Sequence, residues 1–240
     1  CFSGGAQQVV NRYPYVQSPT ENSAIIAWRT RDAGPSMLIY GESPDRMTDT
    51  LRTDELNKKH KFEISGLDAD QVYYYQAITP GVFTSNIEYF SSAKPAGKSG
   101  IRFLHYGDCG YDNEIQNKIS GMMEQEEVDF GIVAGDVDQG NGDAYDKVIF
   151  GVYKNMLAHD CHYPALENHD CIKNGGETFL DDFYLPHNNP QQTERYYSFV
   201  WGNAKFICLD SNSDYKPGSD QHNWMLDELK DREREWLFVF

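Results

Sequence analysis

The chain has 240 residues, of which 40% are hydrophobic and 14% aromatic, and it carries a formal net charge of −16 at pH 7. This apolar content is enough to build a packed core and excludes a disordered chain. No run of about 18 apolar residues is present that would span a membrane. An acidic chain also lacks the basic surface that binds a nucleic-acid backbone, so we expect no such partner.

The charge is divided unevenly along the chain. Residues 1–97 hold 9 Lys and Arg against 11 Asp and Glu, whereas residues 98–240 hold 12 against 26. A nearly neutral front and an acidic rear predict two structural units. The excess carboxylates of the rear unit are either a solvated surface or ligands for hard cations, and composition alone favours the solvated surface.

Five cysteines stand at positions 1, 109, 161, 171 and 208. Cys161 and Cys171 are close enough in sequence to pair, but spacing does not decide this. Cys1 is followed by small residues, a start similar to that of mature bacterial lipoproteins, with an arbitrary sequence boundary as the alternative. We therefore expect a secreted, periplasmic or cell-surface protein, with a lipid on Cys1 as an open option for a membrane tether.

Residues 13–92, after a tail at 1–12, show the alternation of an all-β sandwich. Trp28 shares a face with other apolar residues of the run 23–30, and Tyr73 does so in the run 73–77. About seven short strands separated by turns are typical of an immunoglobulin or fibronectin type III sandwich. The stretch 67–75 resembles the fibronectin type III turn, with Tyr73 in the tyrosine-corner position. We expect Trp28 and Tyr73 to be buried, and we assign this unit no chemistry.

Residues 93–100 are rich in Gly, Pro and small side chains and predict a linker. Residues 101–240 then alternate strand and helix patterns, which indicates an α/β layer fold. Strands are expected at 101–106, 130–134, 163–166, 196–200, 205–209 and 236–240, and helices at 114–127, 143–158 and 219–230. Helix 114–127 is expected to bury Ile115, Ile119, Met122 and Met123, and 143–158 is the clearest helix of the chain. The apolar run 236–240 ends the sequence, which predicts an incomplete α/β unit.

Polar residues follow three successive strands of the rear unit, in the motifs Gly107-Asp108-Cys109-Gly110, Gly135-Asp136 and Asn168-His169-Asp170. Ligands of α/β sheets bind at the carboxyl ends of strands. A carboxylate can bridge two cations that clamp a phosphoryl group, and a histidine beside it can protonate a leaving oxygen. A neighbouring carboxylate can hold that imidazole in place. The three motifs together point to a two-metal hydrolase.

This order of motifs resembles the metallophosphoesterases, and Gly110 makes it similar to the purple acid phosphatase branch, in which a fibronectin-like domain commonly precedes the catalytic one. The resemblance implies a layered αββα domain that hydrolyses phosphate esters with water activated by two divalent or mixed-valence ions (Fe, Zn, Mn or Mg). It implies that Asp108 ligates the first ion, Asp136 bridges both and Asn168 ligates the second. His169 would assist phosphoryl transfer, with Asp170 orienting its imidazole.

The sequence departs from that family pattern at several positions. Gln139 stands where the family has a Tyr, and Glu167 stands where it has a Gly. Asp138 is either a substitute ligand or acidic surface. The later histidine motifs are absent, and we interpret His187 and His222 as surface or packing residues.

Two readings of the function follow from these departures. The first is a phosphate-ester hydrolase. In that case we expect these 240 residues on their own to bind metals weakly and to hydrolyse phosphate esters poorly. The alternative is a non-catalytic extracellular binding module that keeps the fold. A nucleotide-binding α/β domain is disfavoured, because neither GxGxxG nor GxxxxGK[ST] is present.

Overall fold

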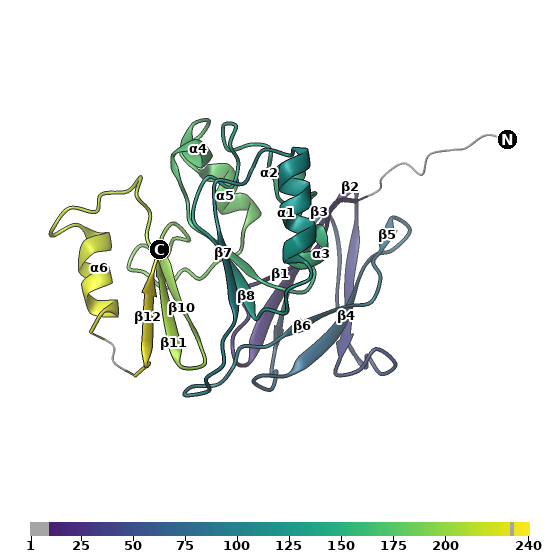
Figure 1. Cartoon of the computed structure of the whole chain (residues 1–240). Coiled ribbons are helices and arrows are strands. Elements are labelled where there is room, and N and C mark those ends of the chain that lie inside the picture. Colours follow the sequence, from purple (N-terminus) through teal and green to yellow (C-terminus); the bar gives the residue numbers. More distant parts are fainter. Residues whose placement is uncertain (1–9, 231–232) are drawn as a thin grey trace.

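The computed structural model describes residues 10–230 and 233–240, so Cys1 and its predicted lipid lie outside the described residues. The front half of the chain forms strands only (Figure 1). They are β1 (Val10–Gln17), β2 (Ser23–Gly41), β3 (Asp49–Ser65), β4 (Val72–Thr79), β5 (Phe83–Thr84) and β6 (Glu88–Ser91). Their order is β1-β2-β4-β5, with β3 also paired to β2 and β6 to β4.

Strand β2 extends well beyond the run 23–30 that the alternation indicated. It is one strand of 19 residues. The register with β3 shifts between Arg29 and Gly34, so the glycine and proline there produce an irregularity instead of a chain reversal. Trp28 and Tyr73 are buried as predicted, with 1% and 6% exposure. The Tyr73 hydroxyl accepts a hydrogen bond from the backbone N–H of Asp68 at 2.8 Å, a contact typical of a tyrosine corner.

The rear half contains two small sheets that face each other. Strands β7 (Phe103–Tyr106), β8 (Phe130–Val133) and β9 (His162–Pro164) are parallel. Strands β10 (Tyr197–Trp201) and β11 (Ala204–Cys208) form a hairpin, and β12 (Trp236–Val239) runs parallel to β11. Aromatic rings join the two sheets: the ring centroids of Phe103 and Phe206 are 5.3 Å apart.

Six helices of the described chain surround these sheets: α1 (Glu114–Met123), α2 (Tyr145–Val148), α3 (Lys154–Leu157), α4 (Asn168–Cys171), α5 (Glu177–Asp182) and α6 (Asp220–Glu228). None of the described helices is long and apolar enough to cross a bilayer. The helix predicted over 143–158 is instead two short helices separated near Gly151, where a side chain would meet the Lys147 carbonyl oxygen at 2.7 Å. Its apolar positions are nevertheless buried.

Helix α1 contradicts most of the prediction of its buried face. Ile115, Ile119 and Met122 are exposed by 68%, 48% and 69%, and of the four predicted residues Met123 alone is half-buried against the core. The buried residues are Gln116 and Ser120, which donate hydrogen bonds to the backbone oxygens of Val148 and Val152. Polar contacts with the α2–α3 segment therefore orient this helix, and they outweigh its apolar stripe.

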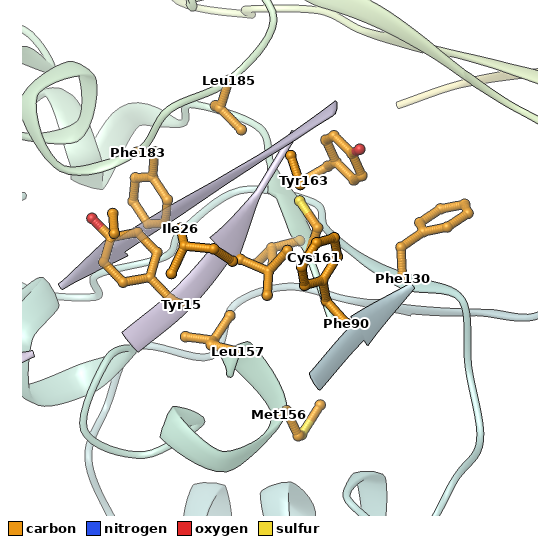
Figure 2. Close-up of a cluster of buried hydrophobic side chains, with 14 of the residues drawn as sticks. Tyr15, Ile26, Phe90, Phe130, Met156, Leu157, Cys161, Tyr163, Phe183 and Leu185 are labelled. Carbon is orange, nitrogen blue, oxygen red and sulfur yellow. The ribbon is translucent and has the colours of Figure 1, made fainter. Parts of the chain in front are cut away.

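A single hydrophobic core joins the two halves of the chain (Figure 2). Tyr15 and Ile26 of the front strands share this core with Leu157, Cys161 and Phe183 of the rear half. All four described cysteines, at 109, 161, 171 and 208, are free thiols, so Cys161 and Cys171 are not paired. The two halves thus share one core despite the linker-like sequence between them.

Candidate active site at the strand ends

The turns that follow β7 and β8 place two carboxylates next to each other. Asp108 and Asp136 both have left-handed backbone conformations, with φ of 55° and 48°. The two turns bond to one another, because the N–H of Asp108 donates to Gly135 O at 3.2 Å and that of Cys109 donates to Asp136 O at 3.3 Å. Non-glycine residues adopt such φ values at a cost, and costs of this kind cluster at functional sites.

Gln139 lies between these two carboxylates. Its Nε2 donates a hydrogen bond to Oδ1 of Asp108 and a second, at 3.3 Å, to Oδ2 of Asp136. Because one nitrogen reaches both groups, the two oxygens lie within about 7 Å of each other. The structure thus brings Asp108 and Asp136 together, while their predicted ligand roles stay predictions.

Glu167 is a third carboxylate at this edge of the sheet. Its side chain lies against Gly135, where an added Cβ would meet Glu167 Cγ at 2.7 Å. Burial raises the pKa of the Glu167 carboxyl, and its contact with Asp136 raises the pKa further. Oδ1 of Asp136 is buried and has no hydrogen-bond partner among the described residues. Two carboxyl groups in contact require a shared proton or a cation.

Asn168 faces Glu167 and not the Asp108–Asp136 pair. In the amide orientation that satisfies its surroundings, the nitrogen donates to the Glu167 carboxylate and the oxygen accepts from the His169 N–H at 3.2 Å. Glu167 also caps α4, since its carboxylate accepts from the backbone N–H of Asn168. The predicted role of Asn168 as a metal ligand would require its amide to turn away from this partner.

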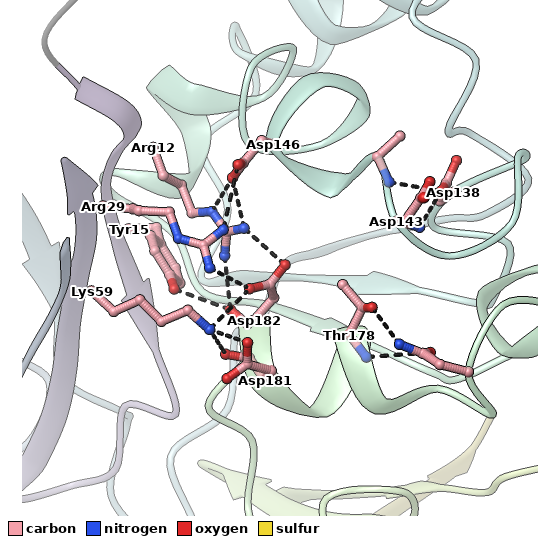
Figure 3. Close-up of polar contacts among 12 residues, drawn as sticks. Arg12, Tyr15, Arg29, Lys59, Asp138, Asp143, Asp146, Thr178, Asp181 and Asp182 are labelled. Atoms are coloured by element: carbon pink, nitrogen blue, oxygen red, sulfur yellow. Dashed lines mark hydrogen bonds and ion pairs between the residues drawn. The ribbon is translucent and has the colours of Figure 1, made fainter. Parts of the chain in front are cut away.

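Asp138 is neither a ligand nor acidic surface. It is 1% exposed, and its carboxylate accepts four backbone N–H groups, from Gly140 at 2.8 Å, Gly142 at 3.0 Å, Asp143 at 2.9 Å and Ala144 at 3.0 Å. Figure 3 shows part of this arrangement around Asp138 and Asp143. The side chain therefore fixes the loop that carries Gln139.

Asp170 does not hold the His169 imidazole in the described structure. Its buried carboxylate accepts from the Tyr145 hydroxyl at 2.8 Å and from the N–H groups of Asp138 at 3.1 Å and Glu167 at 3.3 Å. Burial raises the pKa of Asp170 to about 6. Successive residues of a helix do not face each other, which explains why Asp170 points inward while His169 points out. Asp170 therefore holds the backbone at Asp138 and Glu167 in place through these hydrogen bonds.

His169 is half-buried beside the loop that contains Gln139. Its Nδ1 lies 3.5 Å from the carbonyl oxygen of Gly140, at the limit of hydrogen-bond distance. The imidazole is thus partly open to solvent and lies against the loop that carries Gln139.

Sequence reasoning missed Tyr111, whose hydroxyl donates to Oδ1 of Asp108 at 3.4 Å. The only available signal was its place three residues after Asp108 in the same turn. His187 is largely exposed, and His222 accepts the Gly218 N–H near the start of α6. Among the described residues, neither histidine contacts the strand-end carboxylates.

The donors described here do not fit a two-ion site. Within residues 10–230 and 233–240, no group of three or more His, Cys, Asp or Glu side chains is arranged to hold a metal ion. The Asn168 amide is hydrogen-bonded to Glu167. The Gln139 amide directs its N–H groups at the carboxylate pair, and N–H groups do not ligate cations. What the residues form is a carboxylate pair held by a neutral amide.

Comparison with known proteins shows which of them resemble this chain in sequence and in fold. Purple acid phosphatase 18 of Arabidopsis thaliana is 26% identical, over 89% of this chain and 52% of that protein. Probable purple acid phosphatase 20 of the same plant is 27% identical, over 72% and 41%. The structure of purple acid phosphatase PPD1 from yellow lupin (Lupinus luteus) seeds matches with a TM-score of 0.78 at 16% identity, over 95% of this chain and 50% of that one.

The chain spans about half the length of the curated relatives it matches. No family model matches it. The names of these relatives support a phosphoester hydrolase family. The chain has a fold of the purple acid phosphatase type.

Proposed function

We propose that this chain provides the strand-end part of a site that hydrolyses phosphate esters. The observation that carries the proposal is the convergence of Asp108 and Asp136 on two hydrogen-bonded turns, with the half-buried His169 against the loop that carries Gln139. Ligands of α/β folds bind at this edge of the sheet. The likeness in fold to a purple acid phosphatase supports the reaction class.

Each side chain has a distinct role in the proposed site. Asp108 and Asp136 are the candidate cation ligands. His169 donates a hydrogen bond to a phosphoryl oxygen and protonates the leaving oxygen, for which an imidazole that is partly open to solvent is suited. Asp138 and Asp170 are positioning residues that hold the loop. Their carboxylates already accept hydrogen bonds from backbone N–H groups and from the Tyr145 hydroxyl.

The test is hydrolysis of an aryl phosphate by the full natural protein that contains these residues, with Mn²⁺, Zn²⁺ or iron supplied. We expect His169→Asn to lower kcat by about 10² to 10⁴, the range of general acid catalysis. His187→Asn, which changes an exposed histidine away from the site, is the matched control and should leave kcat unchanged. Full activity of His169→Asn would remove the proposed role of this residue.

The 240-residue chain on its own should hydrolyse the same ester poorly or not at all, since its described donors do not complete a two-ion site. Equal turnover by this chain and by a longer natural protein would show that residues 1–240 hold a complete site.

A second candidate is a non-catalytic extracellular module that keeps the fold. The hydrogen bonds of Gln139 to both carboxylates favour it, because they satisfy the pair without an ion. Absence of turnover with every metal in the full natural protein would support this candidate. Under either function we propose export from the cytoplasm, on the basis of the fibronectin-like sequence pattern of the front half.

A further inference from the structure

The front and rear halves of the chain also meet where β6 lies against the residues that follow α3. We propose that this contact, made by Glu88 and Tyr89 with His159 and Asp160, is a pH-sensitive latch that acid tightens and neutral pH loosens. The contact contains none of the strand-end residues, so it is independent of the proposed hydrolysis. The shared core holds the two halves together at either pH, so the latch acts locally.

His159 binds the front half through its nitrogen and through its ring. Its Nε2 lies 2.9 Å from Oε2 of Glu88, and its ring stacks on Tyr89 with the centroids 4.0 Å apart and 12° between the planes. The other oxygen of Glu88 accepts from the Tyr13 hydroxyl at 2.8 Å, which fixes the carboxylate. Histidine is the side chain that ordinarily gains its charge between pH 8 and 5. Protonation of His159 therefore converts a hydrogen bond from a neutral ring into a stronger, charge-assisted pair.

Asp160 is a second titrating group beside the same rings. Its carboxyl has no hydrogen bond or ion pair among the described residues, and burial, followed by the charge of Asp129, raises its pKa to about 7. Burial and then the charge of Asp160 raise the pKa of Tyr89, so Asp160 lies near the ring that stacks on His159. In an unfolded chain an aspartate titrates near pH 4. Between about pH 4 and 7 the folded state binds more protons, so the stability contributed by Asp160 grows as pH falls.

An open cavity lets water reach this contact. His159 and Asp160 line a cavity of about 750 Å³ between β6 and the segment 123–129. His159 also lines a smaller cavity of about 310 Å³ beside Tyr13. The larger cavity has room for many water molecules. An ionised Asp160 is therefore able to gain hydration through a small separation from β6, whereas a protonated Asp160 gains little from it.

The charged groups around the two cavities leave Asp160 without a cation of its own. They are Lys94, Arg102, Glu124, Glu126, Glu127, Asp129 and Lys154. Both cations of the larger cavity are already paired, Lys94 with Asp129 at 2.7 Å and Arg102 with Glu126 at 3.2 Å. The remaining acids favour the protonated form of Asp160.

The first test is thermal unfolding of the 240-residue chain and of Asp160→Asn, which mimics the protonated carboxyl, at pH 7.5 and pH 5. One pKa unit corresponds to about 3 to 5 °C in the Tm of a domain of this size, so we expect Asp160→Asn to raise Tm by about 3 °C or more at pH 7.5. The gain should fall to less than half at pH 5, where the unchanged Asp160 is itself protonated. Asp227→Asn is the matched control, because it changes an exposed carboxylate of α6, and its effect should be the same at both pH values.

The second test removes the charge of His159. His159→Gln keeps a donor for Glu88 but gains no proton, so its loss of Tm should be larger at pH 5 than at pH 7.5. His222→Gln, near the start of α6, is the matched control, and its difference from the unchanged chain should not vary with pH. Each variant is compared with the unchanged chain at the same pH, so the titration of other groups cancels. An equal loss for His159→Gln at both pH values would contradict the charging of His159.

Hydrogen exchange of backbone amides distinguishes a latch from a general change in stability. After correction for the intrinsic pH dependence, exchange of the β6 amides in the unchanged chain should slow about tenfold from pH 7.5 to pH 5, the effect of one pKa unit. Asp160→Asn should show the slower exchange already at pH 7.5, and the amides of β11 should not share this change. A rise in Tm without protection of β6, or no rise at pH 7.5, would overturn the proposal. Because neither ester nor metal is present, failure of the hydrolase proposal would leave these readings unaffected.

Discussion

Two clusters of carboxylates in this molecule are built in opposite ways. At the boundary between the halves, Asp146, Asp181 and Asp182 lie against the cations Arg12, Arg29 and Lys59 (Figure 3). At the strand ends, Asp108 and Asp136 share the neutral amide of Gln139, and Glu167 lies against Asp136. None of these three carboxylates forms an ion pair with Lys or Arg within the described residues.

The difference distinguishes carboxylates that stabilise the fold from carboxylates that are candidates for a functional site. The boundary cluster is neutralised by the chain itself, so its carboxylates contribute to joining the two halves. The strand-end cluster is left to be compensated by a proton or an external cation, an arrangement typical of functional sites. Net charge alone does not distinguish the two clusters.

The strongest way to break the boundary cluster is to remove Arg12. Its guanidinium is 2% exposed, pairs with Asp182 at 2.8 Å and lies 3.8 Å from the Phe150 ring centroid. Arg12→Met leaves Asp182 buried with fewer partners, and we expect the free energy of unfolding to fall by about 4 kcal/mol in urea denaturation. Lys59→Met is the control: it removes the more exposed ion pair with Asp181 and should cost less than about 1 kcal/mol. Similar costs for both variants would contradict the account.

Two buried histidines predict a dependence of stability on pH that is independent of the carboxylates. Burial lowers the pKa of His60 and of His162 to about 4, from about 6.5 in the unfolded chain. Between these values the unfolded state binds more protons, so stability is present above pH 6.5 and is lost as pH falls towards 4. Each histidine should contribute a loss of about 3 kcal/mol over this window.

Denaturation curves at several pH values check this expectation. The variant His60→Gln, which can still bond to Thr30 and Ser36, should lose less stability on acidification than the unchanged chain. Parallel pH profiles for the two proteins would show that His60 does not titrate as described.

The loop that carries Gln139 should depend on Asp138 more than on its neighbour Asp143. Asp138→Asn replaces an oxygen that accepts backbone N–H groups by an amide donor, and we expect a loss of about 2 kcal/mol in unfolding free energy. Asp143→Asn changes an exposed carboxylate paired with Lys173 and should cost under about 1 kcal/mol. Equal losses would mean that the loop is not held by Asp138.

The smallest expected effect concerns the exposed apolar face of α1. Met122→Gln should change stability by less than about 0.5 kcal/mol, because Met122 is 69% exposed. Gln116→Ala should cost about 1 kcal/mol, since it removes the buried hydrogen bond to Val148 O. The opposite order in thermal unfolding would restore the predicted orientation of the helix.

Sequence patterns predicted the six strands of the rear half to within two residues, because short apolar runs are a local property. They missed β1, which begins inside the predicted tail 1–12, and the full lengths of β2 and β3. The face of α1 was wrong, since the hydrogen bonds of Gln116 and Ser120 to residues 32 positions away leave no periodic signal. The role of Asp138 was missed for a similar reason: its partners are backbone N–H groups of a loop whose shape the sequence does not state. Gln139 was visible as an unusual residue, but only the structure shows the two carboxylates that it contacts.

The central claim is that an external cation binds at the strand ends and not at the boundary cluster. Anomalous diffraction from a crystal soaked in Mn²⁺ tests it directly, because it locates the ion in both regions at once. The account predicts a peak beside Asp108 and Asp136, and no peak at Asp146, Asp181 or Asp182. A peak at the boundary cluster with none at the strand ends would contradict it.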